Sequence, residues 1–279
     1  MTAHYALFGH PISQSPSPAM HNAAFKALNI DATYELRPAK QQDLASVLAE
    51  LQQNRWSGGN VTTPLKTEVA KHVRLTGEAQ RAAAVNTVWH DNQQLVGALT
   101  DVDGVFVPLK EQGYAGGGDA LVLGAGGAAR AAVLALEALG ATICIAARDA
   151  NKAQGLIDIL GPGVPTRALA LNDALGLTQA LRQAAVIVQA TPVGRHNERH
   201  PFDWSVVQTT CIAFEMLYTP RMTPFLQDAE RTGCATIAGS EMLLAQGAKA
   251  FSLLTDHDAP TEVMRQALKA ALGSTNSLA

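Results

Sequence analysis

The sequence predicts an α/β fold made of two domains, and three observations support this. Short apolar runs alternate with helical stretches along the chain, a pattern typical of helices layered on a sheet. The length of 279 residues exceeds the roughly 100 to 200 residues of a typical single domain. A glycine-rich turn beginning at Gly124 stands between an apolar strand and a long Ala/Leu helix. That context predicts a Rossmann-type dinucleotide-binding domain in the second half.

Composition excludes several classes of function. The chain is 47% hydrophobic and 16% charged with a net charge of -3, as expected for an ordinary globular protein. No basic run is present and the pI is about 6.2, so nucleic acid is not an expected partner. The apolar stretch 131–147 is interrupted by Glu137 and Gly140, so we expect no membrane span. The N-terminus lacks the pattern of a signal peptide, which predicts a cytoplasmic protein.

The first half predicts alternating strands and helices. We expect strands over 5–8, 32–36 and 59–62, and helices over 19–28, 41–53 and 67–83. Residues 85–89 and 94–97 predict a hairpin around Asp91 and Asn92. The cysteines Cys144, Cys211 and Cys234 have no paired spacing and are expected to be buried thiols.

Two polar segments of this half are candidate sites. Ser15 and Ser17 stand at the entrance of the first helix, where two hydroxyls suit a small anion, although serines before prolines also simply shape turns. Asn60 and Thr62 alternate along a strand end and therefore point to one side. Lys66 follows in the first turn of the next predicted helix, with Thr63 as N-cap and Pro64 as first helical residue.

Lys66 is therefore a candidate for acid-base chemistry, because the helix macrodipole disfavours a cation at that position. The alternative is a surface lysine on an ordinary helix. Asp101 ends the stretch after the hairpin. An aspartate there is commonly a cap or turn former, unless a partner faces it.

The second half begins after the linker-like segment 113–119. Residues 120–123 predict a buried strand, and Gly124, Ala125, Gly126, Gly127 and Ala128 form the turn that opens a helix. The glycines permit a tight turn and close approach of the pyrophosphate to the helix N-terminus. A second strand is expected over 142–147, later strands over 185–189, 211–214 and 235–238, and closing helices over 239–254 and 261–272.

The end of the second strand bears on the choice of cofactor. Arg148 and Lys152 favour the 2′-phosphate of NADP, whereas Asp149 favours a ribose hydroxyl and NAD. The two cations outnumber the acid, so we expect NADP, with NAD possible. Thr191 lies in a turn at the carboxyl end of the strand 185–189, where open α/β sheets bind ligands.

Taken together, the sequence resembles the shikimate dehydrogenase family over essentially its whole length. The resemblance rests on ordered blocks, which are Ser15-Pro-Ser17-Pro-x-x-His21-Asn22, Asn60-Val-Thr-Thr-Pro-Leu-Lys66, Asn86-Thr87, Thr100-Asp101, Gly124 to Arg130, Thr191-Pro-Val-Gly194, Tyr218-x-Pro and Met242-Leu-x-x-Gln246. It implies a substrate-binding domain of residues 1–103 and 240–279, and an NAD(P)-binding Rossmann domain of residues 104–239. The last helices would pack back on the first domain.

The resemblance also assigns roles. It implies that Lys66 and Asp101 form the acid-base pair and that Ser15, Ser17 and Tyr218 bind the substrate carboxylate. Asn60, Thr62, Asn86 and Gln246 would surround the ring hydroxyls, and Thr191 and Gly239 would contact the cofactor. The implied activity is the reversible reduction of 3-dehydroshikimate to shikimate.

Several residues depart from the family pattern, namely Leu99, Asp149, Gln189, Arg195, Glu215 and Glu241. They leave open a quinate, aminoshikimate or other ring hydroxy-acid dehydrogenase that uses NAD, and a regulator that binds the dinucleotide without chemistry. No metal is expected, since His196 and His200 are four residues apart but lie in a charged loop. The sequence is compatible with a monomer or a homodimer.

Overall fold

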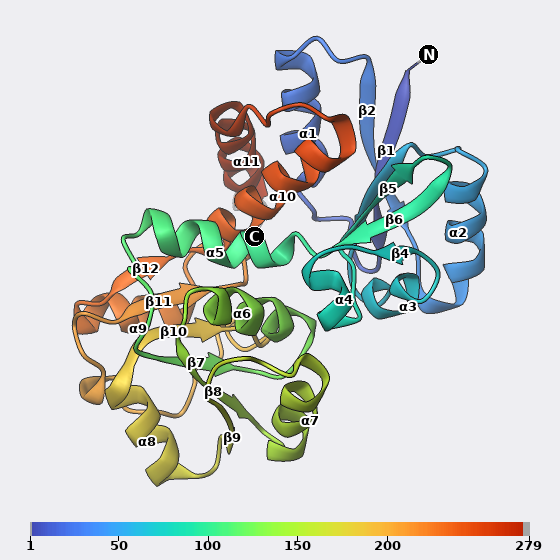
Figure 1. Cartoon of the computed structure of the whole chain (residues 1–279). Helices are drawn as coiled ribbons and strands as arrows, with labels where there is room; N and C mark the ends of the chain where they lie inside the picture. The colour runs from blue at the N-terminus through green and yellow to red at the C-terminus, as the bar shows by residue number, and fades with distance from the viewer. Residues whose placement is uncertain (1, 276–279) are drawn as a thin grey trace. The chain divides into compact units, whose positions relative to one another are not determined.

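The computed structural model describes residues 2–275 and separates the chain into two compact units (Figure 1). The boundaries fall after Thr100 and before Leu244. The first unit therefore contains both ends of the chain, and the second contains the middle. Each unit holds one six-stranded sheet, so the predicted α/β class is confirmed.

The sheet of the first unit is mixed. Its strand order is β2-β1-β3-β5-β6-β4, with β1 parallel to β2 and β3, β5 antiparallel to β3 and β6, and β4 parallel to β6. The elements of its N-terminal part are β1 (Ala3–Gly9), α1 (Ser17–Ala27), β2 (Ala32–Pro38), η1 (Gln41–Asp43), α2 (Leu44–Gln52), β3 (Gly58–Val61), α3 (Lys66–Ala70), β4 (Arg74–Leu75), α4 (Glu78–Ala82), β5 (Thr87–Asp91) and β6 (Gln94–Ala98).

This topology gathers the candidate segments at one edge. The parallel strands β1 and β3 end at the same edge, and the antiparallel hairpin places the start of β5 and the end of β6 there as well. The loop after β1, the segment after β3, Asn86 before β5 and Thr100 after β6 therefore share one side of the sheet. Strand pairing thus makes neighbours of residues that are distant in sequence.

The predicted helix over 67–83 is wrong. Two short helices, α3 and α4, flank the strand β4 instead, because Arg74 and Leu75 pair with Val96 and Gly97 of β6. The predicted cap is also wrong. Leu65 is the N-cap residue of α3, and Pro64 lies in the turn before it, after a cis peptide bond. Lys66 is consequently the first residue of the helix.

The sheet of the second unit is fully parallel, with the order β12-β11-β10-β7-β8-β9. The order reverses between β7 and β10, which is the switch point of a Rossmann fold. Its elements are α5 (Asp101–Glu111), β7 (Asp119–Leu123), α6 (Gly127–Ala138), β8 (Thr142–Ala147), α7 (Ala150–Leu160), β9 (Thr166–Ala170), α8 (Ala174–Gln183), β10 (Ala184–Gln189), η2 (Trp204–Val206), β11 (Ile212–Glu215), α9 (Pro224–Thr232) and β12 (Ala235–Ile237).

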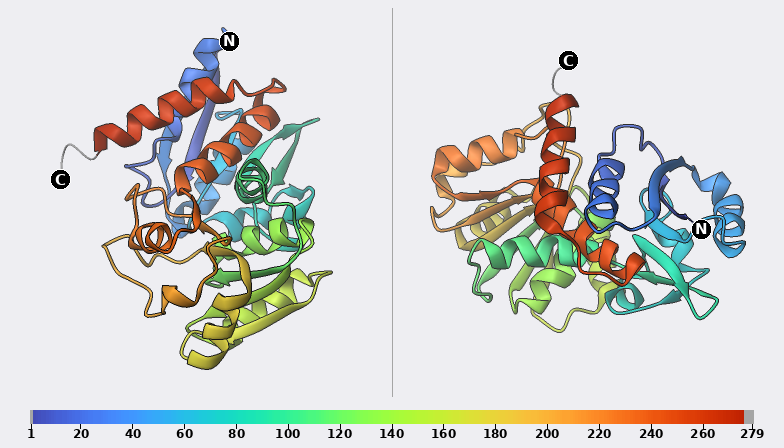
Figure 2. Two further views of the ribbon diagram at one scale, coloured as in Figure 1. Left: turned by 90° about the vertical axis from the view of Figure 1, so that its left-hand side faces the viewer. Right: turned by 90° about the horizontal axis from the view of Figure 1, so that it is seen from above.

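The closing helices α10 (Gly239–Thr255) and α11 (Thr261–Thr275) return the chain to the first unit. The red helix α11 lies beside the blue helix α1 (Figure 2). On α10, Phe251 contacts the ring of Phe25 of α1 at a centroid distance of 5.5 Å, and the carbonyl of Leu254 accepts a hydrogen bond from the hydroxyl of Tyr5. The C-terminal helices thus complete the core of the first unit.

The burial pattern follows the fold. The central strands β7, β8 and β10 of the Rossmann sheet are apolar and almost entirely buried, as expected of parallel strands covered by helices. All three cysteines are free and buried, as predicted. Among the helices of the described chain, none is long and apolar enough to cross a bilayer.

Candidate functional site

A buried network of neutral side chains lies at the shared edge of the first sheet. Thr100 donates its backbone N–H to Asn86 Oδ1 at 2.6 Å, and Asn86 Nδ2 donates to the Thr100 hydroxyl at 3.0 Å. The hydroxyls of Thr87 and Thr100 are 3.1 Å apart. All three residues are almost inaccessible to solvent, so these bonds fix the end of β6 against the start of β5.

Asn60 belongs to the same network and is held on every side. Its amide nitrogen donates to the carbonyl of Asn86 and to the hydroxyl of Thr87, both at 3.0 Å, and its Oδ1 accepts the hydroxyl of Tyr34 at 2.7 Å. Both amide protons are therefore used within the protein. Asn60 therefore connects β3 to Tyr34 of β2 and to Asn86 and Thr87 at the start of β5.

Gln246 brings α10 to this edge. Its Oε1 accepts a hydrogen bond from Asn86 Nδ2 at 3.2 Å, although the two residues are 160 positions apart in sequence. Gln246 is buried. Two of the residues predicted to surround a substrate therefore meet directly, and a helix near the C-terminus is tied to the strand edge.

The two serines lie together at the start of α1. Ser15 Oγ donates to Ser17 Oγ at 3.1 Å, and the backbone N–H of Ser17 donates to Ser15 Oγ at 3.3 Å. Pro16 is the N-cap residue, and neither serine caps the helix. The two hydroxyls are therefore held next to each other at the entrance of α1, an arrangement that suits binding of one external group.

Lys66 and Thr62 stand in the segment after β3, and both are partly buried. Lys66 begins α3. Asp101 begins α5 in the second unit and is buried. Tyr218 also belongs to the second unit, in the loop after β11.

Tyr34 and His21 support the network, and we did not predict them as site residues. The ring of His21 stacks on that of Tyr34, with centroids 4.3 Å apart and an interplanar angle of 6°. Burial lowers the pKa of His21 to about 3, so its ring is neutral. The block Ser15 to Asn22 contained His21 but gave no sign of the aromatic partner on β2.

The glycine-rich turn of the second unit fits a dinucleotide. Gly124 has a φ of +115°, and a Cβ there would lie 2.9 Å from the carbonyl oxygen of Ala190. A Cβ on Gly126 or Gly127 would meet nothing within 4 Å, so the space before α6 is open. The backbone N–H groups of the first turn of α6 are thus accessible to a phosphate group. Ala125 and Ala128 complete this turn.

The charged residues after β8 have distinct roles. Asp149 is the N-cap residue of α7, and its carboxylate accepts the backbone N–H of Asn151 at 3.0 Å. Arg148 and Lys152 are exposed beside it. Asp149, which favours NAD by its residue type, is therefore explained by its role as a helix cap. Arg148 and Lys152 remain as two cations at the end of β8.

The neighbouring strand ends carry buried polar groups. Gln189 ends β10 and Glu215 ends β11, and they are partners in register. Glu215 accepts the backbone N–H of Leu217 and the hydroxyl of Thr223, and burial raises its pKa to about 7. These bonds hold both ends of the loop that carries Tyr218. Gly239 packs closely against the same loop, because a Cβ at position 239 would lie 2.2 Å from the backbone oxygen of Leu217.

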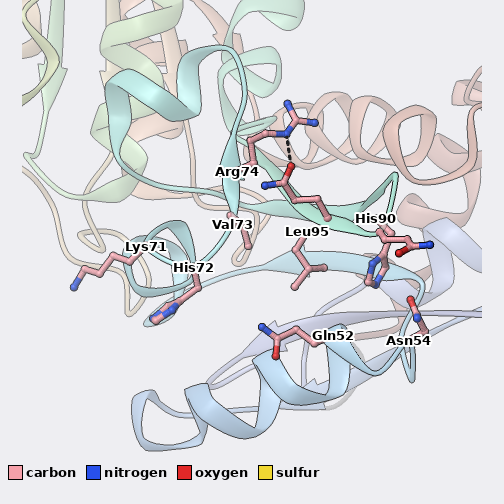
Figure 3. Close-up of a pocket in the computed structure, with 10 residues that line it drawn as sticks. Gln52, Asn54, Lys71, His72, Val73, Arg74, His90 and Leu95 are labelled. Carbon is pink, nitrogen blue, oxygen red and sulfur yellow. Dashed lines mark hydrogen bonds between the residues drawn. The ribbon is translucent and has the colours of Figure 1, made fainter.

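A hollow of about 920 Å³ lies elsewhere in the first unit, and none of the predicted residues lines it (Figure 3). The lysine and arginine side chains that line this hollow form ion pairs with neighbouring carboxylates. Lys71 pairs with Glu68, and Arg74 pairs with Asp91 while donating to Gln94. Within residues 2–275, no group of three or more His, Cys, Asp or Glu side chains is placed to hold a metal ion.

Comparison with known proteins gives one family. The family pattern described as "Shikimate dehydrogenase substrate binding domain" matches residues 7–88, and "Shikimate 5'-dehydrogenase C-terminal domain" matches residues 239–269. A relative named shikimate dehydrogenase (NADP(+)) from Desulfitobacterium hafniense is 37% identical over 98% of this chain and 99% of its own.

Two solved structures support the same family. Shikimate 5-dehydrogenase from Listeria monocytogenes, in complex with shikimate and NAD, has a TM-score of 0.90 at 30% identity, covering 96% of each chain. Shikimate 5-dehydrogenase from Thermus thermophilus, in complex with NADP(H) and shikimate, has a TM-score of 0.87 at 34% identity, covering 97% of this chain and 100% of the other. With these similarities extending along nearly the whole sequence, the chain belongs to the shikimate dehydrogenase family.

Proposed function

We propose that the chain catalyses the reversible NADP-dependent reduction of 3-dehydroshikimate to shikimate. One observation carries the proposal: the chain is 37% identical, over nearly its full length, to a relative named as an NADP-dependent shikimate dehydrogenase. The open glycine turn before α6 and the neutral hydroxyl and amide edge of the first unit support the proposal, because they would supply the two kinds of binding that this reaction requires.

The proposed substrate-binding part is residues 1–103 with 240–279, and the cofactor-binding part is residues 104–239. Ser15, Ser17 and Tyr218 would bind the carboxylate of the ring acid. Hydroxyl donors suit this task because hydrogen bonds to an anion are individually strong, and an arginine is not required. The distance of 3.1 Å between the two serine hydroxyls supports their acting on one group.

Asn60, Thr62, Asn86 and Gln246 would surround the ring hydroxyls. Both amide protons of Asn60 and both of Asn86 are donated within the network, so these two side chains would hold the strand edge in place for the substrate. Thr62 and Gln246 would bind the ring hydroxyls directly.

Lys66 and Asp101 are the proposed acid-base pair. When bound, NADPH supplies the hydride that reduces the ketone. Lys66 would donate a proton to the carbonyl oxygen as negative charge develops on it, and Asp101 would return Lys66 to its protonated form by way of solvent. In the oxidative direction Lys66 accepts the hydroxyl proton.

NADP is the proposed cofactor in preference to NAD. Arg148 and Lys152 are exposed beside the strand end and would hold the 2′-phosphate. The carboxylate of Asp149 is engaged with the N-terminus of α7, which reduces its availability to a ribose hydroxyl. Gly124 to Ala128, Thr191 and Gly239 would contact the remainder of the cofactor.

A second candidate is the oxidation of quinate or a related ring acid with NAD. Leu99 favours it, because this buried leucine stands beside the Thr100-Asp101 block where the family usually has an asparagine. Loss of an amide there would relax selection for the ring hydroxyls. A regulator without chemistry is a third candidate, and it predicts that Lys66 is dispensable.

Initial-rate kinetics separate these candidates. We expect kcat/KM to be highest for shikimate with NADP, with quinate or NAD lower by at least tenfold. A preference for quinate with NAD would support the second candidate. The absence of turnover with all four combinations, together with tight NADP binding, would support the regulator.

The proposed setting is the cytoplasm, where the three buried thiols would stay reduced. The catalytic unit is a monomer or a homodimer acting on a small molecule. Light scattering at the concentration of the kinetic assay distinguishes the two states.

A further inference from the structure

Gln189 is a fully buried amide whose hydrogen-bonding groups are all used. Its Oε1 accepts the backbone N–H of Thr191 at 3.1 Å and the Thr191 hydroxyl at 3.0 Å. Its Nε2 donates to the carbonyl of Val193 at 3.0 Å and contacts Nε2 of His200. One side chain at the end of β10 therefore holds both ends of the turn that follows.

The orientation of this amide determines the state of His200. A backbone N–H only donates and a carbonyl only accepts, so the bonds to Thr191 and Val193 fix which end of the Gln189 amide is nitrogen. The remaining proton of Nε2 then points at His200, whose Nε2 must accept it. His200 is consequently neutral with its proton on Nδ1, and burial lowers its pKa to about 4, in agreement.

His200 is itself fixed by an aromatic series that leads into the core. Its ring stacks on Phe202 with centroids 5.3 Å apart, Phe202 contacts Trp204 at 5.4 Å, and Trp204 meets Phe225 edge to face at 5.2 Å. Phe225 is buried in the core of the second unit. The acceptor for Gln189 is therefore anchored, although it lies in an exposed, charged loop.

The turn held by Gln189 lies against the glycine-rich turn. A Cβ on Gly124 would lie 2.9 Å from Ala190 O and 3.0 Å from Thr191 Cγ2, so the two turns are in close contact. Thr191 also accepts the backbone N–H of Val193 on its hydroxyl. Any shift of Thr191 would therefore displace or loosen the backbone at Gly124.

We infer that Gln189 and His200 are positioning residues for the cofactor: His200 orients the Gln189 amide, which fixes the Thr191 turn against the glycine-rich turn. The Gln189 side chain is long enough to reach Thr191, Val193 and His200 together. The inference rests on the proposed binding of NADP by this unit.

The test measures NADPH affinity by titration calorimetry in four proteins. His200→Ala leaves a buried amide proton without an acceptor, and we expect the Kd for NADPH to rise about tenfold. His200→Gln keeps an acceptor and should remain within about threefold of the unaltered protein. His196→Ala, in the same loop, is the matched control and should not change the Kd.

A double-mutant cycle distinguishes positioning from a general loss of structure. If His200 acts through Gln189, then adding His200→Ala to Gln189→Leu should change the Kd less than twofold. An equal tenfold effect in both backgrounds, or a Kd unaffected by His200→Ala alone, would overturn the inference. Gln189→Asn provides a second variant, expected to weaken NADPH binding because the shorter amide cannot reach all its partners.

Hydrogen exchange supplies a readout that does not depend on the cofactor. The amides of Thr191 and Val193 should exchange faster in His200→Ala and remain protected in His196→Ala. If the unaltered protein fails to bind NADPH, the proposed function is refuted. If it binds NADPH while neither the affinity nor the exchange responds to His200→Ala, only the positioning inference is refuted.

Discussion

The two candidate binding edges of this molecule are built by different means. In the first unit, side chains from separate strands and a distant helix make the edge, as the bonds among Asn60, Asn86 and Gln246 illustrate. In the second unit, the main element is backbone, an open glycine turn at the start of α6. A network of side chains can match the several hydroxyls of one particular ring. Backbone N–H groups suit the phosphate groups of a cofactor that many different proteins bind.

This difference predicts that chemistry and cofactor affinity can be separated by substitution. Lys66→Ala should lower kcat by about a thousandfold, since general acid-base groups typically contribute 10²- to 10⁴-fold. The NADPH Kd should stay within twofold, because Lys66 belongs to the first unit. Steady-state kinetics and titration on the same preparation check both. Unchanged turnover would remove Lys66 from the mechanism.

The side-chain edge should be sensitive to loss of a single amide. Asn86→Ala removes the acceptor of the Thr100 N–H and a donor to Gln246. Each buried group left unpaired costs about 1 to 3 kcal/mol, so we expect a loss of about 3 kcal/mol in the free energy of unfolding. Urea denaturation measures it, with the exposed Gln52→Ala as control. A loss no larger than that of the control would show that the network is not structural.

Two buried groups, His21 and Glu215, should contribute to stability with opposite dependence on pH. The pKa of His21 is lowered to about 3 in the folded first unit, from an ordinary value of 6.5. The unfolded chain therefore binds the extra proton, and this contribution to stability is lost as the pH falls from 6.5 towards 3, by up to about 1.4 kcal/mol per pH unit. His21→Phe keeps an aromatic ring and should remove the acid sensitivity.

The contribution of Glu215 to stability depends on pH in the opposite direction. Its pKa is raised to about 7 in the folded second unit, from 4.5, so the folded state binds more protons between these values. Its contribution falls as the pH rises from 4.5 to 7, and Glu215→Gln should flatten that slope. Thermal unfolding of the single variants between pH 5 and 7.5 tests both residues. Identical slopes in the variants and the unaltered protein would contradict the assignments.

The smallest expected effect concerns cofactor choice. Asp149→Ser keeps an N-cap for α7 but removes a negative charge beside Arg148 and Lys152. We expect the KM for NADP to fall by about threefold, in line with a modest exposed charge interaction. Asp149→Ala should share that change but lose about 1 kcal/mol of stability with the cap. A higher KM for NADP in both variants would argue that Asp149 assists binding.

The same contrast explains what could be predicted from the sequence. The backbone edge is local: a strand, glycines and a helix follow one another, and the strand Thr142–Ala147 was predicted with the bounds that it has. The network at the other edge depends on pairing between distant segments, as the bond between Asn86 and Gln246 shows. The family resemblance named those residues, but no periodicity in the sequence predicts their contact.

Errors and omissions arose where tertiary pairing outweighed local pattern. The helical periodicity over 67–83 did not reveal that Arg74 and Leu75 would pair with β6. The sequence places His200 in a charged loop and does not indicate its contact with Gln189, eleven residues away. Buried polar contacts of this kind are specified by geometry and leave little trace in composition.

The most direct test of the central claim follows the hydride. The protein is incubated with 3-dehydroshikimate and NADPH that carries deuterium at both C4 positions, and the product is examined by mass spectrometry and NMR. We predict shikimate with one deuterium at the carbon that bears the new hydroxyl. Failure to form shikimate, or formation of shikimate without deuterium, would contradict the proposed function.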